Sequence, residues 1–128
     1  MEALVAGVNW LAVGVGTVLS FGLGALWFSP KMFGVKWAAG VGIEISTGAK
    51  QPIAAMAMQF VGTLLLAWII ALAVANDALP IGILFVVTSS ALLMASNMFG
   101  QNSRYATLAE GSFVLTMAAI MIACQLVL

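Results

Sequence analysis

The fold is decided by residues 52–98, which read PIAAMAMQFVGTLLLAWIIALAVANDALPIGILFVVTSSALLMASNM. This stretch contains a single charge, and its apolar pattern is interrupted only at Asn76-Asp77, with a proline close behind. About 20 apolar residues suffice to cross the hydrocarbon of a bilayer, so each half of the stretch is long enough for one crossing. Asn, Asp and Pro in close succession mark a short turn. We therefore expect helices over about 52–75 and 78–98 that lie side by side and antiparallel in a membrane.

The composition of the whole chain supports a membrane protein. Of its 128 residues, 64% are apolar and 6% are charged, with four basic and four acidic side chains. A soluble domain draws roughly a quarter of its residues from the charged set and needs them to cover its surface. Two further apolar segments, about 3–28 and 105–128, flank the central stretch. The sequence thus predicts an all-α polytopic membrane protein, a bundle of four transmembrane helices in a single domain, 1–128.

Helix boundaries are marked by a few polar residues. Ser29 can cap a new helix after the first crossing, and Pro30 suits its first turn. Thr107 and Glu110 fit a capping box for the last helix, although Ser103 could start that helix earlier. The N-terminus carries an acid where a secretory signal would carry Lys or Arg, so we expect the first apolar segment to be retained as a membrane helix.

The charges sort by side when the four segments are drawn as a zigzag. All the basic residues fall in the first and third connections, and two acids fall on the opposite side: Lys31, Lys36, Lys50 and Arg104 against Glu2 and Asp77. Loops rich in Lys and Arg stay in the cytoplasm. We therefore expect loops 29–51 and 99–106 to be cytoplasmic and both termini to lie outside, in a bacterial inner membrane.

The first connection is long and contains aromatic residues. Phe33, Trp37 and Val41 recur at four-residue spacing beside Lys31 and Lys36. This pattern is typical of a short interfacial helix, here about 30–41, whose aromatic face lies in the acyl chains while its lysines reach outward. The alternative is a plain hydrophobic loop tucked against the bundle.

Small residues recur in the first segment at strict four-residue spacing, as Ala12, Gly16, Ser20 and Gly24. In lipid, helices associate through faces on which small side chains let backbones touch. We interpret these four residues as a helix-packing face, directed either at a copy of the chain or at another helix of the same chain.

Strong hydrogen-bonding side chains within or near the predicted crossings are Asn9, Gln59, Asn97 and Glu110. Unpaired polar groups in hydrocarbon cost several kcal/mol, roughly, so these side chains should face the interior. They either join helices or form a polar lining for a small solute or ion. For Glu110, the alternatives are a functional carboxylate in the membrane and a local capping role at the start of the last helix.

Catalytic and metal-binding chemistry has few candidates in this sequence. There is no histidine, and Cys124 is the single cysteine, so we expect no enzyme, no metal and no cofactor. Zero net charge without a basic cluster argues against nucleic acid. The sequence favours a non-catalytic accessory or structural subunit that packs through small-residue faces in a homo-oligomer or a larger membrane-protein complex. The alternative is a small passive channel or transporter lined by Asn, Gln, Ser and Thr.

Two stretches carry a resemblance to a known family. Asn9-Trp10-Leu11-Ala12-Val13 is followed by Gly24-Ala25-Leu26-Trp27-Phe28-Ser29-Pro30 and then by Phe33-Gly34 and Trp37. In these stretches the chain resembles a family of small bacterial integral membrane proteins known only as a domain of unknown function. The resemblance implies a four-helix protein of similar length and an interfacial motif formed by Trp27, Ser29, Pro30, Phe33 and Trp37.

The later part of the chain departs from the pattern of that family. Family members carry a Trp-x-Gly-Phe-like patch in helix three and a Glu-Gly-Arg turn before helix four. Here helix three has Phe85-Val86-Val87-Thr88, and the turn at 100–104 keeps only the arginine. The resemblance therefore implies a shared fold and no known chemistry.

Overall fold

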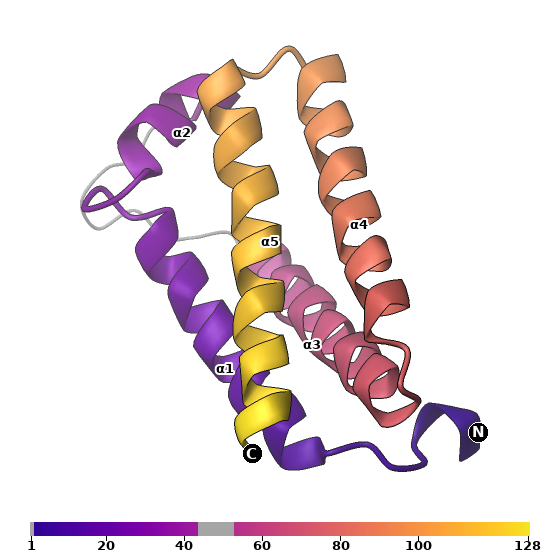
Figure 1. Cartoon of the computed structure of the whole chain (residues 1–128). Coiled ribbons are helices and arrows are strands. Elements are labelled where there is room, and N and C mark those ends of the chain that lie inside the picture. Colours follow the sequence, from indigo (N-terminus) through magenta and orange to yellow (C-terminus); the bar gives the residue numbers. More distant parts are fainter. Residues whose placement is uncertain (1, 44–52) are drawn as a thin grey trace.

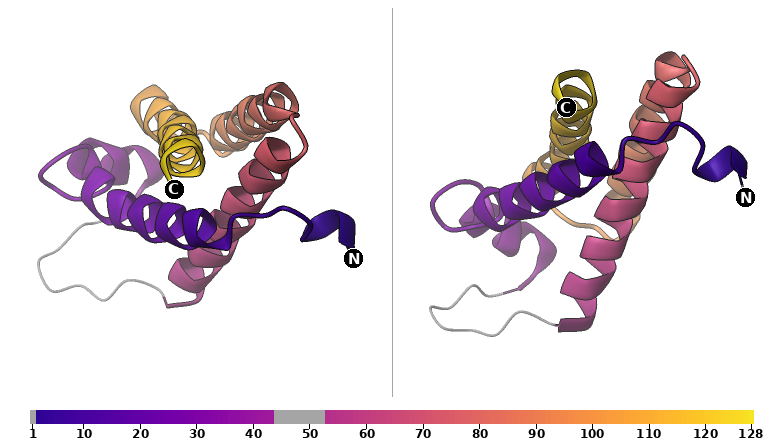
Figure 2. Two further views of the ribbon diagram at one scale, coloured as in Figure 1. Left: turned by 60° about the horizontal axis from the view of Figure 1, so that its bottom comes forward. Right: turned by 90° about the horizontal axis from the view of Figure 1, so that it is seen from below.

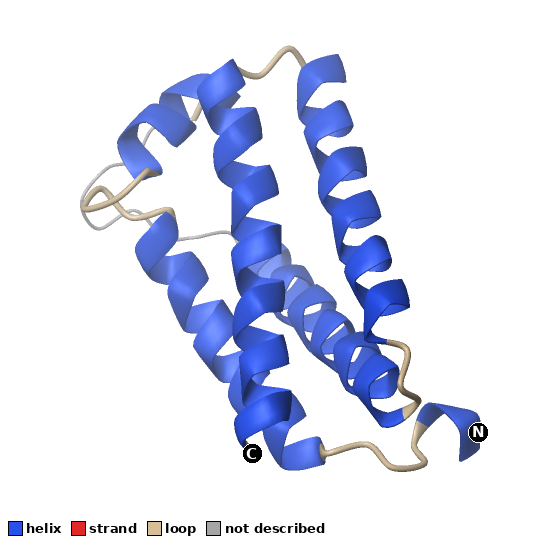
Figure 3. Ribbon diagram, in the orientation of Figure 1, coloured by secondary structure: helices blue, strands red, loops and turns tan. Residues whose placement is uncertain are grey.

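The computed structural model describes residues 2–43 and 53–128, and every regular element in these ranges is a helix (Figures 1 and 3). In chain order the elements are η1 (Glu2–Leu4), α1 (Trp10–Trp27), α2 (Gly34–Val41), α3 (Ile53–Ala75), α4 (Leu79–Phe99) and α5 (Arg104–Val127). Four of them are long and one short helix lies between the first two long ones. The predicted all-α bundle is therefore confirmed.

The four long helices match the thickness of a bilayer. They have 18, 23, 21 and 24 residues for α1, α3, α4 and α5, and each is apolar enough to cross a membrane. At a rise of about 1.5 Å per residue these lengths correspond to roughly 27 to 36 Å, against a hydrocarbon layer of about 30 Å. Large apolar side chains such as Leu11, Ile81 and Leu92 are exposed on their outer faces. Such a surface is stable in lipid, where apolar side chains need no cover.

Helix α5 occupies the centre of the arrangement and contacts α1, α2, α3 and α4 (Figures 1 and 2). Helix α3 also packs against α1 and, near the turn that joins them, against α4. The side chains of the core come from all four long helices: Val13, Leu66, Ala67, Ile70, Ala71, Val86, Phe113, Met117, Ala118 and Met121. The last crossing in the sequence is therefore the one that holds the other helices together.

Helix α1 begins at Trp10, whereas the sequence predicts a crossing from about residue 3. The side chain of Asn9 accepts a hydrogen bond from the backbone N–H of Ala12 at 3.1 Å and so caps the helix there. The preceding residues form the short helix η1 and a turn with Gly7 at a φ of +74°. Trp68 holds this segment by donating a 2.7 Å hydrogen bond to the carbonyl of Leu4.

The turn between α3 and α4 is as short as its sequence predicts. Asp77 adopts a φ of 51°, and the N–H of Ala78 bonds the carbonyl of Ala73 at 2.7 Å. Beyond the turn the helices touch closely, because a Cβ placed on Gly82 would lie 2.8 Å from the Cβ of Ala73. A glycine at 82 therefore lets the antiparallel pair approach.

Helix α5 begins at Arg104, capped by Ser103, whose hydroxyl oxygen accepts from the N–H of Ala106 at 3.0 Å. The predicted capping box at Thr107 and Glu110 is therefore wrong, and the earlier start at Ser103 holds. Thr107 is buried within the first turn, where its hydroxyl donates to the carbonyl of Ser103. Because the helix starts one turn earlier, Glu110 lies in its second turn and is free for a tertiary contact.

The charged residues that the structure describes lie towards the two ends of the bundle. Helix α2 and the α4–α5 loop lie at one end, whereas the α3–α4 turn and both chain termini lie at the other (Figure 1). Lys31 and Lys36 belong to the first of these ends, as does Arg104 at the start of α5. Lys50 lies outside the described residues. The cations that are described therefore share one end, as the zigzag predicts.

Candidate functional site

The motif of the first connection folds into a tight turn followed by α2. Ser29 caps no helix. Its hydroxyl donates back to the carbonyl of Leu26 at 2.6 Å, and its own carbonyl accepts from the N–H of Gly34 at 2.9 Å. The N–H of Phe33 reaches the carbonyl of Trp27 at 3.0 Å. These bonds fold residues 28–33 into a turn, so the short helix begins at Gly34, after the exposed Pro30, instead of at residue 30.

The aromatic residues of the motif meet aromatic residues of α5. Phe33 lies 4.8 Å from Trp27, and Phe28 lies 4.7 Å from Trp37, measured between ring centroids. Phe113 of α5 lies 5.1 Å from Phe28 and 5.9 Å from Trp27. With Tyr105, whose ring is 6.4 Å from Phe33, these residues form what we call the aromatic cluster: Trp27, Phe28, Phe33, Trp37, Tyr105 and Phe113.

Both tryptophans of the cluster donate hydrogen bonds to α5. The indole N–H of Trp27 donates to the carbonyl of Ala109 at 3.0 Å, and that of Trp37 donates to Oε2 of Glu110 at 3.1 Å. Glu110 is half-buried. Its carboxylate thus serves as an acceptor that fixes α2 on α5, a role that differs from the capping role considered from sequence.

The structure corrects the expected position of the aromatic face of α2. Phe33 and Trp37 point at α1 and α5 and not into the acyl chains, while Gly34 and Ala38 on the same side are buried. Lys36 lies outside, with its Nζ 5.4 Å from the centroid of the Tyr105 ring. The segment is thus a helix, as one alternative predicts, and is packed against the bundle, as the other does.

Two glycines make this packing possible. A Cβ on Gly34 would overlap the carbonyl oxygen of Phe28 and would lie 2.6 Å from the carbonyl oxygen of Ser29. A Cβ on Gly40 would overlap the hydroxyl of Ser103, and the carbonyl of Gly40 accepts a 3.0 Å hydrogen bond from the N–H of Ser103. Helix α2 therefore touches the turn before it at one end and the start of α5 at the other.

The predicted packing face of α1 points at α5 of the same chain. Ala12, Gly16 and Ser20 are buried, and a Cβ on Gly16 would lie 3.5 Å from the Cα of Met121. At Gly24 the same test places a Cβ 3.0 Å from the ring of Phe113. The hydroxyl of Ser20 is fully buried and has no hydrogen-bond partner within the described residues. This face is occupied within the chain.

The four candidate lining residues lie at separate places. Asn9 caps α1 at the end of the bundle that holds the termini. Asn97 is buried near the opposite end, where it donates to the carbonyl of Leu93 and accepts from the amide of Asn102 at 2.7 Å. Glu110 binds Trp37, and Gln59 is exposed on α3. The structure does not bring these side chains together.

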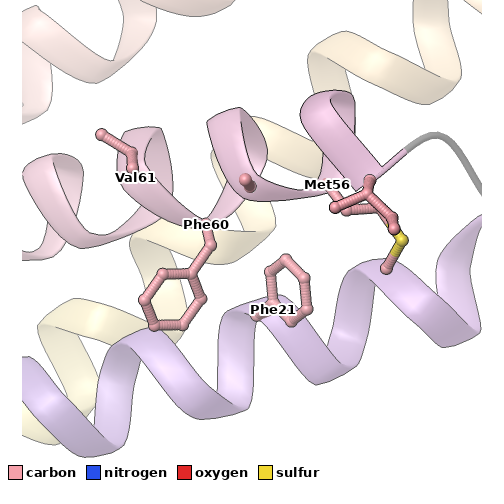
Figure 4. A pocket seen from close by; sticks show the side chains of 6 residues that line it. Phe21, Met56, Phe60 and Val61 are labelled. Atoms are coloured by element: carbon pink, nitrogen blue, oxygen red, sulfur yellow. The ribbon is translucent and has the colours of Figure 1, made fainter.

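An open pocket of about 470 Å³ lies between α1 and the first half of α3 (Figure 4). Its lining is wholly apolar: Phe21, Ile53, Met56, Ala57, Phe60 and Val61. The rings of Phe21 and Phe60 stand edge to face at 5.5 Å. A surface of this kind offers no polar group to orient a ligand and suits an acyl chain of the surrounding lipid.

Several contact residues were not singled out from the sequence. Phe113 and Ala109 occupy α5, far along the chain from the motif that they contact, and no local pattern distinguishes them. Gly34 belongs to the motif that carries the family resemblance, but the sequence does not show that Gly34 approaches the preceding turn or that Gly40 approaches the start of α5. Ser90 of α4 donates to the carbonyl of Gly111 at 2.9 Å and fixes α4 to α5.

Comparison with known proteins gives a family without an assigned role. A sequence model described as "Protein of unknown function (DUF1761)" matches residues 11–125. This match confirms the resemblance to a family of unknown function that the motif of the first connection indicates. Neither the curated proteins nor the solved structures contain a match to the chain.

Proposed function

The chain belongs to the DUF1761 family of proteins of unknown function, and from this premise we propose that it is a non-catalytic structural or accessory subunit of a membrane assembly. The observation that carries the proposal is the use of its polar side chains. The side chains of Trp27, Trp37 and Ser90 form hydrogen bonds between helices of the described chain, while the outer faces of the long helices are apolar. A chain with apolar outer faces is suited to packing against other helices in a membrane.

The aromatic cluster supports a structural role for the motif of the first connection. Its rings contact one another, and the hydrogen bonds of Trp27 and Trp37 end on a backbone carbonyl and a carboxylate of α5. Edge-to-face and tilted aromatic pairs at these distances contribute roughly 0.5–1.5 kcal/mol each beyond burial. We infer that the motif fastens α1 and α2 to the start of α5 and does not bind a substrate.

The competing function is a passive channel. The separate positions of the polar residues argue against a channel. Conduction needs a continuous polar track. Asn9 lies at one end of the bundle, whereas Asn97 and Glu110 lie towards the other, and the core between them is formed mainly by apolar side chains such as Ile70 and Met117.

We further propose that the protein lies in a bacterial inner membrane with both termini outside. The described cations Lys31, Lys36 and Arg104 share one end of the bundle, and the positive-inside rule assigns that end to the cytoplasm.

Reconstitution tests the proposal. Purified protein in liposomes is assayed for potassium flux and for uptake of small neutral and anionic solutes, with protein-free liposomes as the baseline. We expect flux equal to the baseline for every solute. Saturable flux that increases with protein content would replace the accessory role with transport.

A further inference from the structure

The first half of α3 is largely uncovered by the rest of the described chain, apart from the contact of Phe60 with Phe21 of α1. Every residue from Ile53 to Gly62 is exposed, whereas the second half buries residues such as Ala67 and Ile70. Figure 2 shows the reason, because α3 diverges from α4 and α5 towards its own N-terminus. An apolar surface of this kind is ordinary in lipid. A polar residue on such a surface is unusual, and this surface has one.

That residue is Gln59, an amide on an otherwise apolar surface. It lies about 9 Å along the helix axis from Ile53, within a helix that is long and apolar enough to cross a bilayer. Its side chain points deeper along the helix, with Nε2 3.4 Å from the hydroxyl oxygen of Thr63. This distance is longer than an ordinary hydrogen bond. Its amide oxygen has no partner among the described residues.

The side chain of Gln59 is directed along α3 towards Thr63, away from the N-terminal end of the helix. A glutamine near a membrane surface can reach outward to water, but this one is drawn towards Thr63, one turn further from Ile53. The Nε2 group has this one long hydrogen bond, and an amide oxygen left without a donor in hydrocarbon costs several kcal/mol, roughly. Lipid tails have neither donors nor acceptors, so a protein group must supply them.

Two small residues flank Gln59 on the same face. Ala55, Gln59 and Gly62 are spaced i, i+4 and i+7, which places them on one side of the helix. A Cβ on Gly62 would meet nothing within 4 Å. The same side continues down α3 to Ala73, which is in close contact with Gly82 of α4. The uncovered face is therefore a continuation of an established helix–helix contact.

We propose that two copies of this chain pair in the membrane through the face Ala55, Gln59 and Gly62, with α3 against α3. An amide has both a donor and an acceptor, so two Gln59 side chains related by a twofold axis satisfy each other through two hydrogen bonds. Copies inserted in the same orientation bring Gln59 to the same depth, as this pairing requires. The small residues on either side allow the backbones to approach.

This inference rests on the proposed packing function and names its partner and its surface. The small-residue face of α1 is not available for the same purpose, because α5 covers it. The apolar pocket beside Phe21 lies on another side of α3 and lacks polar groups, so lipid chains suffice to fill it.

Cysteine cross-linking tests the surface. In a Cys124→Ala background, Ala55→Cys is compared with Leu92→Cys, an exposed position on α4, and both are treated in native membranes with a short bis-maleimide. We expect a covalent dimer from Ala55→Cys and monomer from Leu92→Cys. Equal cross-linking at both positions, or none at either, overturns the proposed face.

Removal of the amide tests the role of Gln59. Gln59→Leu should raise the dimer dissociation constant in lipid about eightfold, as expected for two interhelical hydrogen bonds of average strength in a membrane. The matched control is Thr88→Val, because Thr88 is an exposed polar residue of α4 whose hydroxyl is already bonded to the carbonyl of Leu84 at 2.8 Å. It should leave the constant unchanged. The constant is measured by fluorescence energy transfer between labelled copies at decreasing protein-to-lipid ratios.

The outcomes separate this inference from the proposed function. If Gln59→Leu and the wild type dimerise equally, Gln59 does not pair the copies. If no dimer forms but the chain co-purifies stoichiometrically with another membrane protein, the α3 pairing fails while the accessory role stands. If the chain is a monomer without partners and conducts solute, both fail.

Discussion

Substitution of Gly34 by alanine should loosen the attachment of α2 to the bundle. The added Cβ would overlap the carbonyl oxygen of Phe28 and lie 2.6 Å from that of Ser29. Both neighbours are backbone atoms, so no side-chain rotation relieves the contact. The turn must open, and the 2.9 Å hydrogen bond from the N–H of Gly34 to Ser29 is then lost.

The expected loss of stability is about 3 kcal/mol. Forcing extra volume into a packed site costs roughly 1–3 kcal/mol, and a lost backbone hydrogen bond costs about 1 kcal/mol. Displacement of Phe33 and Trp37 from their ring partners adds about 1 kcal/mol. Replacement of glycine by alanine in a helix returns roughly 0.5–1 kcal/mol.

The assay is unfolding in mixed micelles of a mild detergent and dodecyl sulfate, followed by intrinsic tryptophan fluorescence, to which Trp27 and Trp37 of the aromatic cluster contribute. Gly22→Ala is the matched control, because a Cβ there meets nothing within 4 Å. It should raise stability slightly through helix propensity. If Gly34→Ala unfolds at the same denaturant fraction as the wild type, the close approach of α2 to the turn does not exist.

Three further outcomes follow from the same contacts. In a double-mutant cycle, Trp37→Phe and Glu110→Ala should show a coupling of about 1–2 kcal/mol in the same unfolding assay, and additive effects would mean that the indole–carboxylate bond contributes nothing. Gly16→Leu should lower the stability of the single chain by about 1–3 kcal/mol, because α5 leaves no room beside it, and should leave cross-linking through α3 intact while the fold persists. A reporter active only outside the cytoplasm should be active when fused after Leu128 and silent at Gly48, and the reverse pattern would invert the proposed orientation.

The helices of this fold were predictable because their signals are local. Apolar runs of transmembrane length, separated at Asn76-Asp77 and at 100–103, specify four crossings whatever their packing. The turn at Asn76 is short enough to force antiparallel neighbours. No information from distant residues is needed for either inference.

Helix starts were less predictable, since side-chain capping decides them within an apolar sequence. Hydropathy alone extends the first crossing back to residue 3, but the Asn9 side chain bonds Ala12 and starts the helix there. Asn9 therefore has a structural use that its apolar surroundings concealed. Ser103 and Thr107 are both competent caps by type, and the hydrogen bond to Ala106 selects Ser103.

The partner of each face was beyond the reach of the sequence. The four-residue spacing of Phe33 and Trp37 predicts an apolar helix face, but lipid and protein are equally suitable partners for it. The partner is protein, because Phe113 and Glu110 of α5 contact the motif, and both residues lie far along the chain from it. The same holds for Gly16, whose spacing indicates close packing without saying against which helix.

The central claim is that this chain works by packing in an assembly, and the mass of the particle in its native membrane tests that claim most directly. Native mass spectrometry of membrane fragments taken up without detergent reports the chain together with its partners. We predict particles that contain at least two copies of the 13.3 kDa chain, or one copy bound stoichiometrically to another membrane protein. A lone 13.3 kDa chain carrying only lipid would contradict the account.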